Sequence, residues 1–422
     1  MAVAAASAAE APNARARRKR GRWAVELARK SIFARLERLA EGELTVWEGS
    51  QRTVFGRRGG SPSATLIVRD PETWLEVATR GSVGAGSAYI EGLWTSDDLV
   101  ALCRLFVRNR GALEALERGF ASVGQWLLAR AHKRRANTVD GAQRNIVAHY
   151  DLSNEFYALF LDPTMTYSSA LFEREDETLE AAQERKLERL CRELDLKPDE
   201  HLLEIGTGWG GLAVHAASQY GVRVTTTTIS RAQHAAAVAR VRDAGLEDRV
   251  RVLDRDYRLL EGTYDKLVSV EMIEAVGHEF QDGYFAKLSS LVAPHGRVAL
   301  QAIVMRDSLH AQALRGVDFI QTHVFPGSQL PSRGSIAASV ARATDLQEVS
   351  ALDFSPSYAT TLARWRERFH AELPAVRRLG FDDEFVRLWD FYLAYCEAGF
   401  REHSIGVVQL TYAKPRGWKE RV

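Results

Sequence analysis

The chain has 422 residues, of which 46% are hydrophobic and 26% charged, and its formal net charge is +1. These values are typical of a soluble globular protein of about two domains. The three cysteines lie far apart without a Cys-x-x-Cys pair, which argues against a disulfide framework or a structural zinc site. No apolar run reaches the roughly 20 residues of a membrane span, and no secretory signal is recognisable. We therefore expect a cytoplasmic protein without a bound metal.

The first segment, residues 1–40, is predicted to be a basic tail followed by an amphipathic helix. Basic residues from Arg15 to Arg22 precede a stretch in which Trp23, Leu27 and Ile32 recur at helical spacing among arginines and lysines. This pattern is typical of a helix on an anionic membrane surface. A solvated basic tail followed by an ordinary core-facing helix fits the pattern equally well. Nucleic acid is not an expected partner, because no recognised binding module follows the basic run.

Residues 41–111 are predicted to form a small α+β domain, and residues 112–144 a charged helical connector. Alternating hydrophobic residues indicate strands, and helical periodicity indicates helices. The strand patterns lie at 44–47 and 64–68, and the helical patterns at 71–80 and 97–106.

A larger domain is predicted from residue 145 to 422, where strand and helix patterns alternate. The predicted strands are 202–205, 222–229, 249–253, 265–270, 297–304 and 407–412. The predicted helices are 178–194, 231–244, 281–292 and a long helical insertion over 357–400. This alternation predicts an α/β fold with a parallel sheet and helices on both faces.

A glycine cluster follows the first of these strands, and a helical pattern follows the cluster. Gly206, Gly208 and Gly210 permit positive φ and a close approach of the backbone to a ligand. Strand, glycine turn and helix together predict a nucleotide site at the opening of a doubly wound sheet. No carboxylate ends the second strand and no Gly-Lys-Ser/Thr closes the turn, which disfavours a dinucleotide or a phosphate ligand. A nucleoside cofactor without phosphates, S-adenosylmethionine, fits this pattern.

The strand ends offer polar side chains for such a cofactor. Glu204, at the end of the first strand, could face its cationic side, and Asp256 could accept a hydrogen bond from the adenine amino group. Tyr257 could cover the adenine ring. Neutral hydrogen bonds to the ribose hydroxyls could come from Thr228, Ser230 and Gln233.

Several short motifs then occur in a recognisable order. They are His149-Tyr150-Asp151, Tyr167-Ser168-Ser169, Glu204-Ile205-Gly206-Thr207-Gly208-Trp209-Gly210, Glu271-Met272-Ile273-Glu274-Ala275-Val276-Gly277 and Phe325-Pro326-Gly327. With them, roughly residues 140–415 resemble the cyclopropane-fatty-acyl-phospholipid synthase family, whose relatives include the mycolic acid cyclopropane synthases. The N-terminal unit is similar to that family's small lipid-associated domain.

The resemblance implies a Rossmann-like class I S-adenosylmethionine-dependent methyltransferase domain with a small N-terminal lipid-associated domain. It also implies methyl transfer to the cis double bond of unsaturated phospholipid acyl chains at the inner face of the membrane. A cyclopropane ring then forms from a carbocation that a bound bicarbonate deprotonates. Tyr167 and Ser168 would join the cofactor site. The bicarbonate would be held by Glu274, Gln301, Tyr358 and the backbones of Ser169 and Ile303.

Two positions depart from the family pattern, because many members have Cys in place of Ser169 and His in place of Gln301. Glutamine cannot change its protonation state, which bears on the final removal of a proton. Two alternatives therefore stay open beside ring formation. The product could be a methyl- or methylene-branched chain, or the protein could be an inactive lipid-binding protein on the same scaffold. The oligomeric state is open as well, with a homodimer as one candidate.

Overall fold

The computed structural model describes residues 21–111, 152–174 and 176–417, and its chain divides into two compact units. The N-terminal unit contains the described residues up to 111 together with Val317–Val324 and Asp382–Tyr395. The larger unit contains the other described residues. The two later segments of the N-terminal unit had been assigned by sequence to the larger domain. The predicted tail before residue 21 and the predicted connector lie outside the described residues.

The N-terminal unit is an α+β structure, as the alternating pattern predicted. Its four-stranded sheet has the order β2-β1-β3-β4, with β1 parallel to β3 and the other neighbours antiparallel. The strands are β1 (Glu43–Glu48), β2 (Gln51–Gly56), β3 (Ser63–Val68) and β4 (Trp94–Ser96). The helices are α2 (Arg22–Leu36), α3 (Glu72–Ile90), α4 (Leu99–Arg108) and α14 (Phe319–His323).

Helix α3 extends ten residues past its predicted end at Arg80, because a kink joins two helical stretches. The kink lies at Gly81, whose φ of 59° is outside the helical range and is tolerated by a residue without Cβ. A second glycine, Gly86, packs against α14, where a Cβ would lie 2.3 Å from Phe319 Cδ2. The glycine-rich sequence after Arg80 therefore encodes a bent helix with a closely packed face.

The larger unit is built on a seven-stranded sheet with the order β10-β11-β9-β8-β5-β6-β7. The five strands from β9 to β7 are parallel, as predicted, while β11 is antiparallel to both β9 and β10. Edge strand β10 was not predicted, because it is polar and its side chains stay partly exposed. The strands are β5 (His201–Ile205), β6 (Arg223–Thr228), β7 (Val250–Asp254), β8 (Tyr264–Val270), β9 (Val292–Met305), β10 (Gln347–Asp353) and β11 (Ile405–Ala413).

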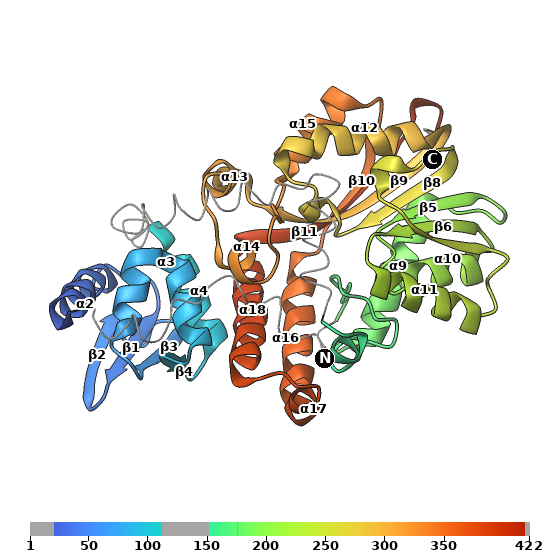
Figure 1. The fold of residues 1–422 in the computed structure, drawn as a ribbon. Coiled ribbons are helices and arrows are strands. Elements are labelled where there is room, and N and C mark those ends of the chain that lie inside the picture. The colour runs from blue at the N-terminus through green and yellow to red at the C-terminus, as the bar shows by residue number, and fades with distance from the viewer. Residues whose placement is uncertain (1–20, 112–151, 175, 418–422) are drawn as a thin grey trace. The chain divides into compact units, whose positions relative to one another are not determined.

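Helices cover both faces of this sheet, with α9, α10 and α11 on one face and α12 and α15 on the other (Figure 1). Thr178 caps the predicted helix before the sheet, since its side chain accepts a hydrogen bond from Ala181 N. The α-helices of this unit are α8 (Asn154–Ala158), α9 (Leu179–Leu194), α10 (Gly211–Tyr220), α11 (Arg231–Asp243), α12 (Gln281–Leu291), α13 (Asp307–Ala313), α15 (Arg333–Ala343), α16 (Ser355–Ala371) and α17 (Leu373–Arg378). Helix α18 (Asp383–Arg401) begins in the N-terminal unit and ends in the larger one. The short 3-10 helices are Tyr257–Leu259, Ile273–Ala275, His278–Phe280 and Pro415–Gly417.

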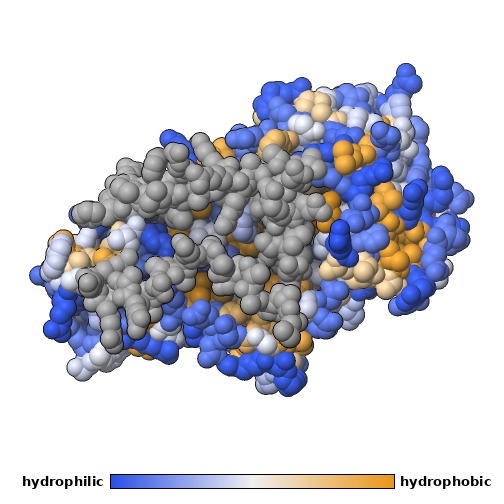
Figure 2. Space-filling view, in the orientation of Figure 1, coloured by the Kyte–Doolittle hydropathy of each residue, from blue (hydrophilic) through white to orange (hydrophobic). Residues whose placement is uncertain are grey.

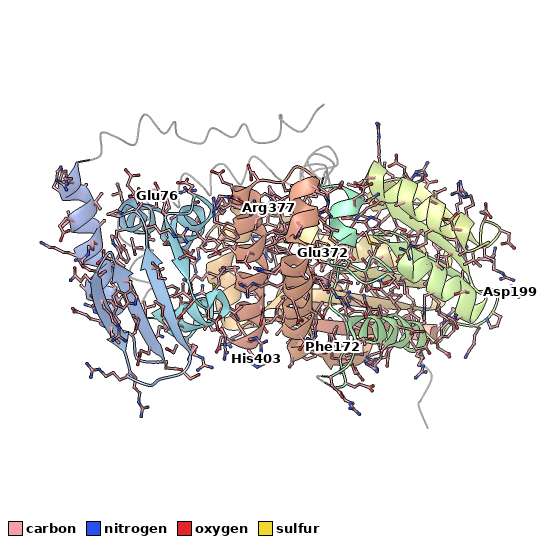
Figure 3. The ribbon with its side chains drawn as sticks, turned by 90° about the horizontal axis from the view of Figure 1, so that it is seen from below. Glu76, Phe172, Asp199, Glu372, Arg377 and His403 are labelled. Atoms are coloured by element: carbon pink, nitrogen blue, oxygen red, sulfur yellow. The ribbon has the colours of Figure 1, made fainter. Side chains whose placement is uncertain are left out.

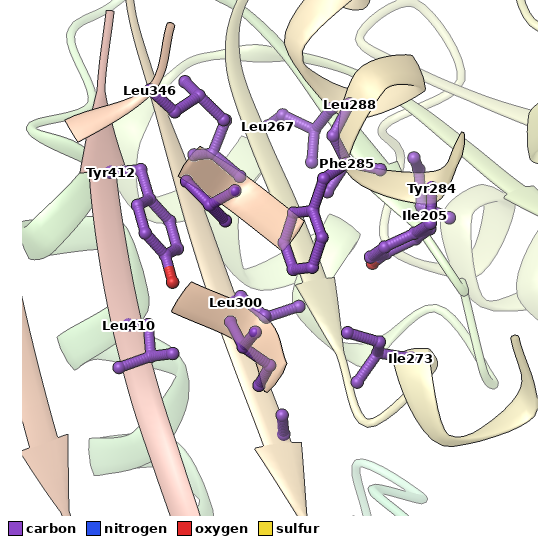
Figure 4. Close-up of a cluster of buried hydrophobic side chains, with 14 of the residues drawn as sticks. Ile205, Leu267, Ile273, Tyr284, Phe285, Leu288, Leu300, Leu346, Leu410 and Tyr412 are labelled. Atoms are coloured by element: carbon purple, nitrogen blue, oxygen red, sulfur yellow. The ribbon is translucent and has the colours of Figure 1, made fainter. Parts of the chain in front are cut away.

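The two-residue period of the strands divides the core between the two faces. Leu203, Leu267 and Leu300 pack with α12 and α15, and Figure 4 shows Leu267 and Leu300 in this cluster. Leu202 and Val268 pack with α9 and α10. All five side chains are fully buried. Burying successive residues on opposite faces is the reason that these strands read as continuous hydrophobic runs.

The visible described surface is mainly hydrophilic, and its hydrophobic side chains form separate areas (Figure 2). Among the helices that the structure describes, none combines the length and hydropathy needed to cross a bilayer.

Candidate active site

The glycine loop joins β5 to α10 and leaves open space beside its backbone. Gly206, Gly208 and Gly210 have φ values of 98°, 52° and 84°, which favour glycine. A Cβ on Gly208 would meet nothing within 4 Å, whereas one on Gly210 would lie 3.3 Å from Ala237 of α11. The buried Thr207 hydroxyl has no hydrogen-bond partner among the described residues. Open backbone and an orphaned hydroxyl fit a bound polar ligand such as S-adenosylmethionine.

The polar residues after β6 are joined to one another around the start of α11. The Thr228 hydroxyl donates to Gln233 Oε1 at 3.0 Å and accepts from Ser230 N at 3.1 Å. The Ser230 hydroxyl in turn caps α11 by accepting from Gln233 N. These residues therefore lie together at the carboxyl end of β6, where a ribose would be expected, and their contact with it stays a prediction.

Asp256 follows β7 and is bound to a neighbour. Its two carboxylate oxygens accept from Arg258 Nε at 2.9 Å and Arg258 Nη2 at 2.6 Å. The guanidinium also lies 5.6 Å from the centre of the Tyr257 ring, which packs edge-on against Tyr284. Contacts of Asp256 and Tyr257 with adenine stay predictions.

Glu204 and Lys186 form a buried polar layer beneath the loop. Glu204 accepts a hydrogen bond from the Thr226 hydroxyl at 2.6 Å, and burial raises its pKa to about 8. Lys186 of α9 donates to the Ser168 hydroxyl at 2.8 Å, and burial lowers its pKa to about 8. Glu204 is thus directed to β6, and its predicted contact with the cofactor has no support in these hydrogen bonds.

A carboxylate cluster lies where β8 and β9 end, and Glu271 is at its centre. Glu271 Oε1 accepts from Ser169 N at 3.0 Å and from Gln301 Nε2 at 2.8 Å, while Oε2 accepts from the Tyr358 hydroxyl at 2.6 Å. The residue is partly buried, and desolvation raises its pKa although these three donors and Lys186 lower it. Hydrogen bonds to a carboxylate favour its ionised form.

Glu274, three residues further on, has fewer partners. One oxygen accepts from Ile303 N at 2.5 Å, and the other has no hydrogen-bond partner among the described residues. Burial, followed by the negative charge of Glu271, raises its pKa to about 8. The two carboxyl groups therefore differ in their surroundings, because Glu271 accepts from three donors whereas Glu274 accepts from one and has a pKa raised to about 8.

Aromatic rings line the cluster on the side of α16. Tyr358 stacks on Phe400 with ring centres 4.4 Å apart, and Tyr167 stacks on Trp365 at 5.2 Å. The loop that carries Ser169 is joined to α16 through Phe172, labelled in Figure 3, whose backbone N donates to Ser357 Oγ at 3.1 Å. Aromatic faces tolerate a nearby positive charge and exclude water.

Comparison with known proteins decides the family. The family model for mycolic acid cyclopropane synthetase matches residues 137–410. A tuberculostearic acid methyltransferase of Mycobacterium tuberculosis is 40% identical over 373 residues, which cover 86% of this chain and 86% of that protein. The cyclopropane-fatty-acyl-phospholipid synthase of Escherichia coli K12 is 34% identical over 359 residues, covering 84% of this chain and 89% of the relative.

A solved structure agrees with these relatives. A mycolic acid cyclopropane synthase complexed with SAH and CTAB has a TM-score of 0.61 and 32% identity, and the match covers 64% of this chain and 98% of that one. The chain belongs to the mycolic acid cyclopropane synthetase family. It is an S-adenosylmethionine-dependent C-methyltransferase that acts on lipid acyl chains by methylation or cyclopropanation. Among the motifs that predicted this family, His149-Tyr150-Asp151 lies outside the described residues.

For this family member, the sequence predicted a bicarbonate held by five residues, and the structure gives their donors other partners. The backbone of Ser169 and the side chains of Gln301 and Tyr358 all bind Glu271, and the backbone of Ile303 binds Glu274. These four donors are engaged by carboxyl groups of the chain, and only Glu274 among the five has an oxygen without a partner among the described residues, so bicarbonate does not fit the arrangement as it stands. Ser169 contributes its backbone, so its replacement of cysteine leaves that hydrogen bond in place.

Two residues of the cluster were missed by sequence reasoning. Glu271 was read as part of a motif without a role of its own. Gln409 of β11 pairs with Gln301 in the sheet, and its Nε2 donates to Gln301 Oε1 at 2.9 Å. This bond directs Gln301 Nε2 toward Glu271. The signal for Gln409 was present, since it is a polar residue inside a hydrophobic strand whose neighbours are buried.

Proposed function

We propose that the protein transfers the methyl group of S-adenosylmethionine to the cis double bond of an unsaturated phospholipid acyl chain. The observation that carries this proposal is the shared edge of one sheet. The glycine loop follows β5 and Glu271 follows β8, and these adjacent strands are parallel, with Ile205 opposite Ser269. Ligands of such sheets bind at the carboxyl ends of the strands, so a methyl donor on the loop would lie beside the carboxylate cluster.

The cofactor would supply an electrophilic methyl group on a positively charged sulfur. The residues that would hold it are Tyr167, Ser168, Glu204, Gly206, Gly208, Gly210, Thr228, Ser230, Gln233, Asp256 and Tyr257. Glycines at the loop allow the backbone to approach it, and the polar residues after β6 face the same edge. The Glu271 carboxyl group, which accepts from the Tyr358 hydroxyl, belongs to the neighbouring cluster and is not counted among the residues that hold the cofactor.

An alkene that accepts a methyl group becomes a carbocation, which must be shielded from water. Tyr358, Phe400 and Trp365 supply aromatic surface beside the cluster, and all three are buried. Their faces stabilise positive charge and offer no nucleophile that would trap it. This aromatic wall favours an alkene substrate over a polar one.

Ring formation is our first choice of product, and a methylene or methyl branch is the second. Both begin from the same carbocation and need a proton removed. The branch is favoured by the 40% identity to a tuberculostearic acid methyltransferase, and the ring by the 34% identity to a cyclopropane-fatty-acyl-phospholipid synthase. An inactive lipid-binding protein is disfavoured, because a strained and fully hydrogen-bonded carboxylate would not be needed for binding alone.

Helix α2 supports a peripheral position on an anionic, cytoplasmic membrane surface. Its Trp23 and Leu27 side chains are 73% and 55% exposed, while Ile32 and Leu36 are buried in the N-terminal unit. Lys30, on the same helix, is also mostly exposed. Exposed aromatic and aliphatic groups beside basic ones are typical of helices that lie in the interface of a bilayer.

The proposal is tested with purified protein and vesicles of dioleoylphosphatidylglycerol in the presence of methyl-labelled S-adenosylmethionine. We expect label in the acyl chains. The ring and the methylene branch have the same mass, two hydrogens below that of a saturated methyl branch, which would need a reductant that this assay does not contain. Vesicles of a fully saturated phosphatidylglycerol are the control and should stay unlabelled. Binding of the cofactor without any label in the unsaturated lipid would overturn the proposal.

A further inference from the structure

Glu271 has a backbone conformation that glutamate disfavours. Its φ of 47° lies in the left-handed region, where a residue with a Cβ is strained by roughly 1–3 kcal/mol and glycine is not. The residue follows a buried strand, and its backbone N donates to Gln301 O at 2.8 Å, which fixes this turn. A strained side chain at the edge of a ligand site is evidence that the side chain itself is needed there.

The donors around Glu271 form a ready anion site that this carboxylate already fills. A backbone N–H, a side-chain amide and a phenol converge on its two oxygens at 2.6–3.0 Å. They come from the loop before α9, from β9 and from α16, which lie far apart in the sequence. Such convergence fixes the carboxylate in one orientation, and preorganised donors of this kind are typical of a reacting group.

The two neighbouring carboxyl groups have environments that separate their roles. Glu271 has three donors and the attraction of Lys186, and it remains partly accessible. Glu274 has one donor and is buried, and the charge of Glu271 favours its neutral form. Paired carboxyl groups with such different surroundings commonly divide into one base and one neutral partner. In this site Glu271 is the carboxyl group that is partly accessible and has the larger number of donors.

We propose that Glu271 is the general base of the reaction, so that the chain itself supplies the carboxylate that the family resemblance assigned to bicarbonate. The inference rests on the proposed function and deepens it by naming the group that takes the proton. It also predicts a methyltransferase whose activity does not depend on bicarbonate.

The step balances without a further reactant. During methyl transfer the alkene electron pair forms the new C–C bond, and the electron pair of the broken S–C bond stays on sulfur. A Glu271 oxygen then takes a proton from the transferred methyl group, and the C–H electron pair closes onto the cationic carbon to form the ring. If a hydride first shifts to the cationic carbon, the same proton removal gives a methylene branch. Glu271 releases the proton to solvent before the next turnover.

Two substitutions separate this role from a structural one. Glu271→Gly relieves the strained backbone and leaves the three donors free for a small anion, while Glu271→Gln keeps the volume but cannot take a proton. Turnover is measured with dioleoylphosphatidylglycerol vesicles in buffer freed of bicarbonate under argon, and then with added bicarbonate or formate. Melting temperatures are recorded for each protein with and without the anions, because an anion that binds the folded state raises them.

We expect the wild type to be equally active with and without bicarbonate. Its melting temperature should not change when bicarbonate is added. Both variants should lose roughly 10²- to 10⁴-fold in turnover at unchanged affinity for S-adenosylmethionine. Bicarbonate and formate should raise the melting temperature of Glu271→Gly and restore part of its turnover, and neither should rescue Glu271→Gln. Rescue by a small anion also shows that the glycine variant is folded.

The inference is overturned if the wild type loses activity when bicarbonate is removed, or if Glu271→Gly keeps full activity without any anion. If the wild type labels no lipid in either buffer, the proposed function is contradicted instead. In that case the melting temperatures still show whether Glu271 occupies the anion site. If it does, bicarbonate should raise the melting temperature of Glu271→Gly and leave that of the wild type unchanged.

Discussion

The glycine loop and the carboxylate cluster lie at the same edge of one sheet, yet they are encoded differently. The loop consists of consecutive residues whose spacing requires a strand, a turn with positive φ and a helix. The cluster joins residues of two strands, a loop and a helix that are separated by up to 240 positions, from Ser169 to Gln409. The glycine loop can therefore be predicted from consecutive residues of the sequence. The partners in the carboxylate cluster are known only once the fold brings them together.

We propose that the two regions serve different steps, with cofactor binding at the loop and chemistry at the cluster. Substitutions in the cluster should therefore change turnover and leave the affinity for S-adenosylmethionine intact. Substitutions in the loop should do the reverse.

After the Glu271 variants themselves, the largest effect is expected for Tyr358→Phe, which removes the hydroxyl that donates to Glu271. Hydrogen bonds to charged groups contribute about 1.5–3 kcal/mol, so we expect a fall in turnover of about 10- to 100-fold. This bond lowers the pKa of Glu271, and its loss should shift the acid limb of the pH–rate profile to higher pH, because the base must be ionised. The measurement is turnover against pH.

Tyr412→Phe is the matched control for this prediction. The buried Tyr412 hydroxyl has no hydrogen-bond partner among the described residues, and it belongs to the core shown in Figure 4. The Tyr412→Phe substitution should leave both turnover and the pH–rate profile unchanged. If the pH–rate profile of Tyr358→Phe coincides with that of the wild type, Tyr358 does not tune the pKa of the base.

Gly208→Ala tests the loop. Gly208 has a φ of 52°, so alanine costs roughly 1–2 kcal/mol of stability and places a methyl group in the space left for the cofactor. We expect a loss of affinity for S-adenosylmethionine of about tenfold or more by calorimetry, with turnover at saturation nearly intact.

The chain offers a control with the same strain. Gly245, at the end of α11, has a φ of 65°, and a Cβ at this position would also meet nothing within 4 Å. Gly245→Ala should lose similar stability and keep its cofactor affinity. Equal affinity losses in the two variants would show that the loop effect is strain alone.

A smaller effect is expected from α2, which belongs to neither region. Replacing Trp23 and Leu27 by alanine removes exposed apolar surface that would enter the bilayer interface. We expect about tenfold weaker sedimentation with phosphatidylglycerol vesicles and unchanged cofactor affinity. Leu259→Ala, at an exposed leucine of the larger unit, is the control. Identical sedimentation of the double variant and the wild type would contradict a membrane role for α2.

The smallest effect on turnover is expected for Glu274→Gln, since the residue keeps its proton below a pKa of about 8 and glutamine resembles its neutral form. Its effect is on stability. The folded protein retains this proton while the unfolded chain releases it near pH 4.5, so the stability that the group contributes falls as pH rises from about 4.5 to 8. In Glu274→Gln, the free energy of unfolding measured in urea should therefore decline less between about pH 4.5 and 8 than it does in the wild type. A fall in turnover as large as that of Glu271→Gln would assign Glu274 to the chemistry.

Sequence reasoning predicted the parallel core of the sheet, the glycine loop and the family, because these depend on periodicity and on contiguous motifs. It missed β10, whose polar residues carry no strand signal, and it ended α3 at a glycine that bends the helix instead. It named Glu274 as an anion holder and gave Glu271 no separate role, and the choice between the two stays a prediction. The two lie three residues apart in one motif, and only the turn that gives Glu271 its positive φ decides which carboxylate meets the donors.

The most direct measurement follows the hydrogens of the transferred methyl group. The enzyme is supplied with S-adenosylmethionine carrying a fully deuterated methyl group, and the acyl chains of the product are analysed by mass spectrometry. Removal of a proton from that methyl group by a neighbouring carboxylate predicts a product that retains two of the three deuterium atoms, whether it is a ring or a methylene branch. A product that retains all three would show that no base acts on the methyl group, and it would contradict the account.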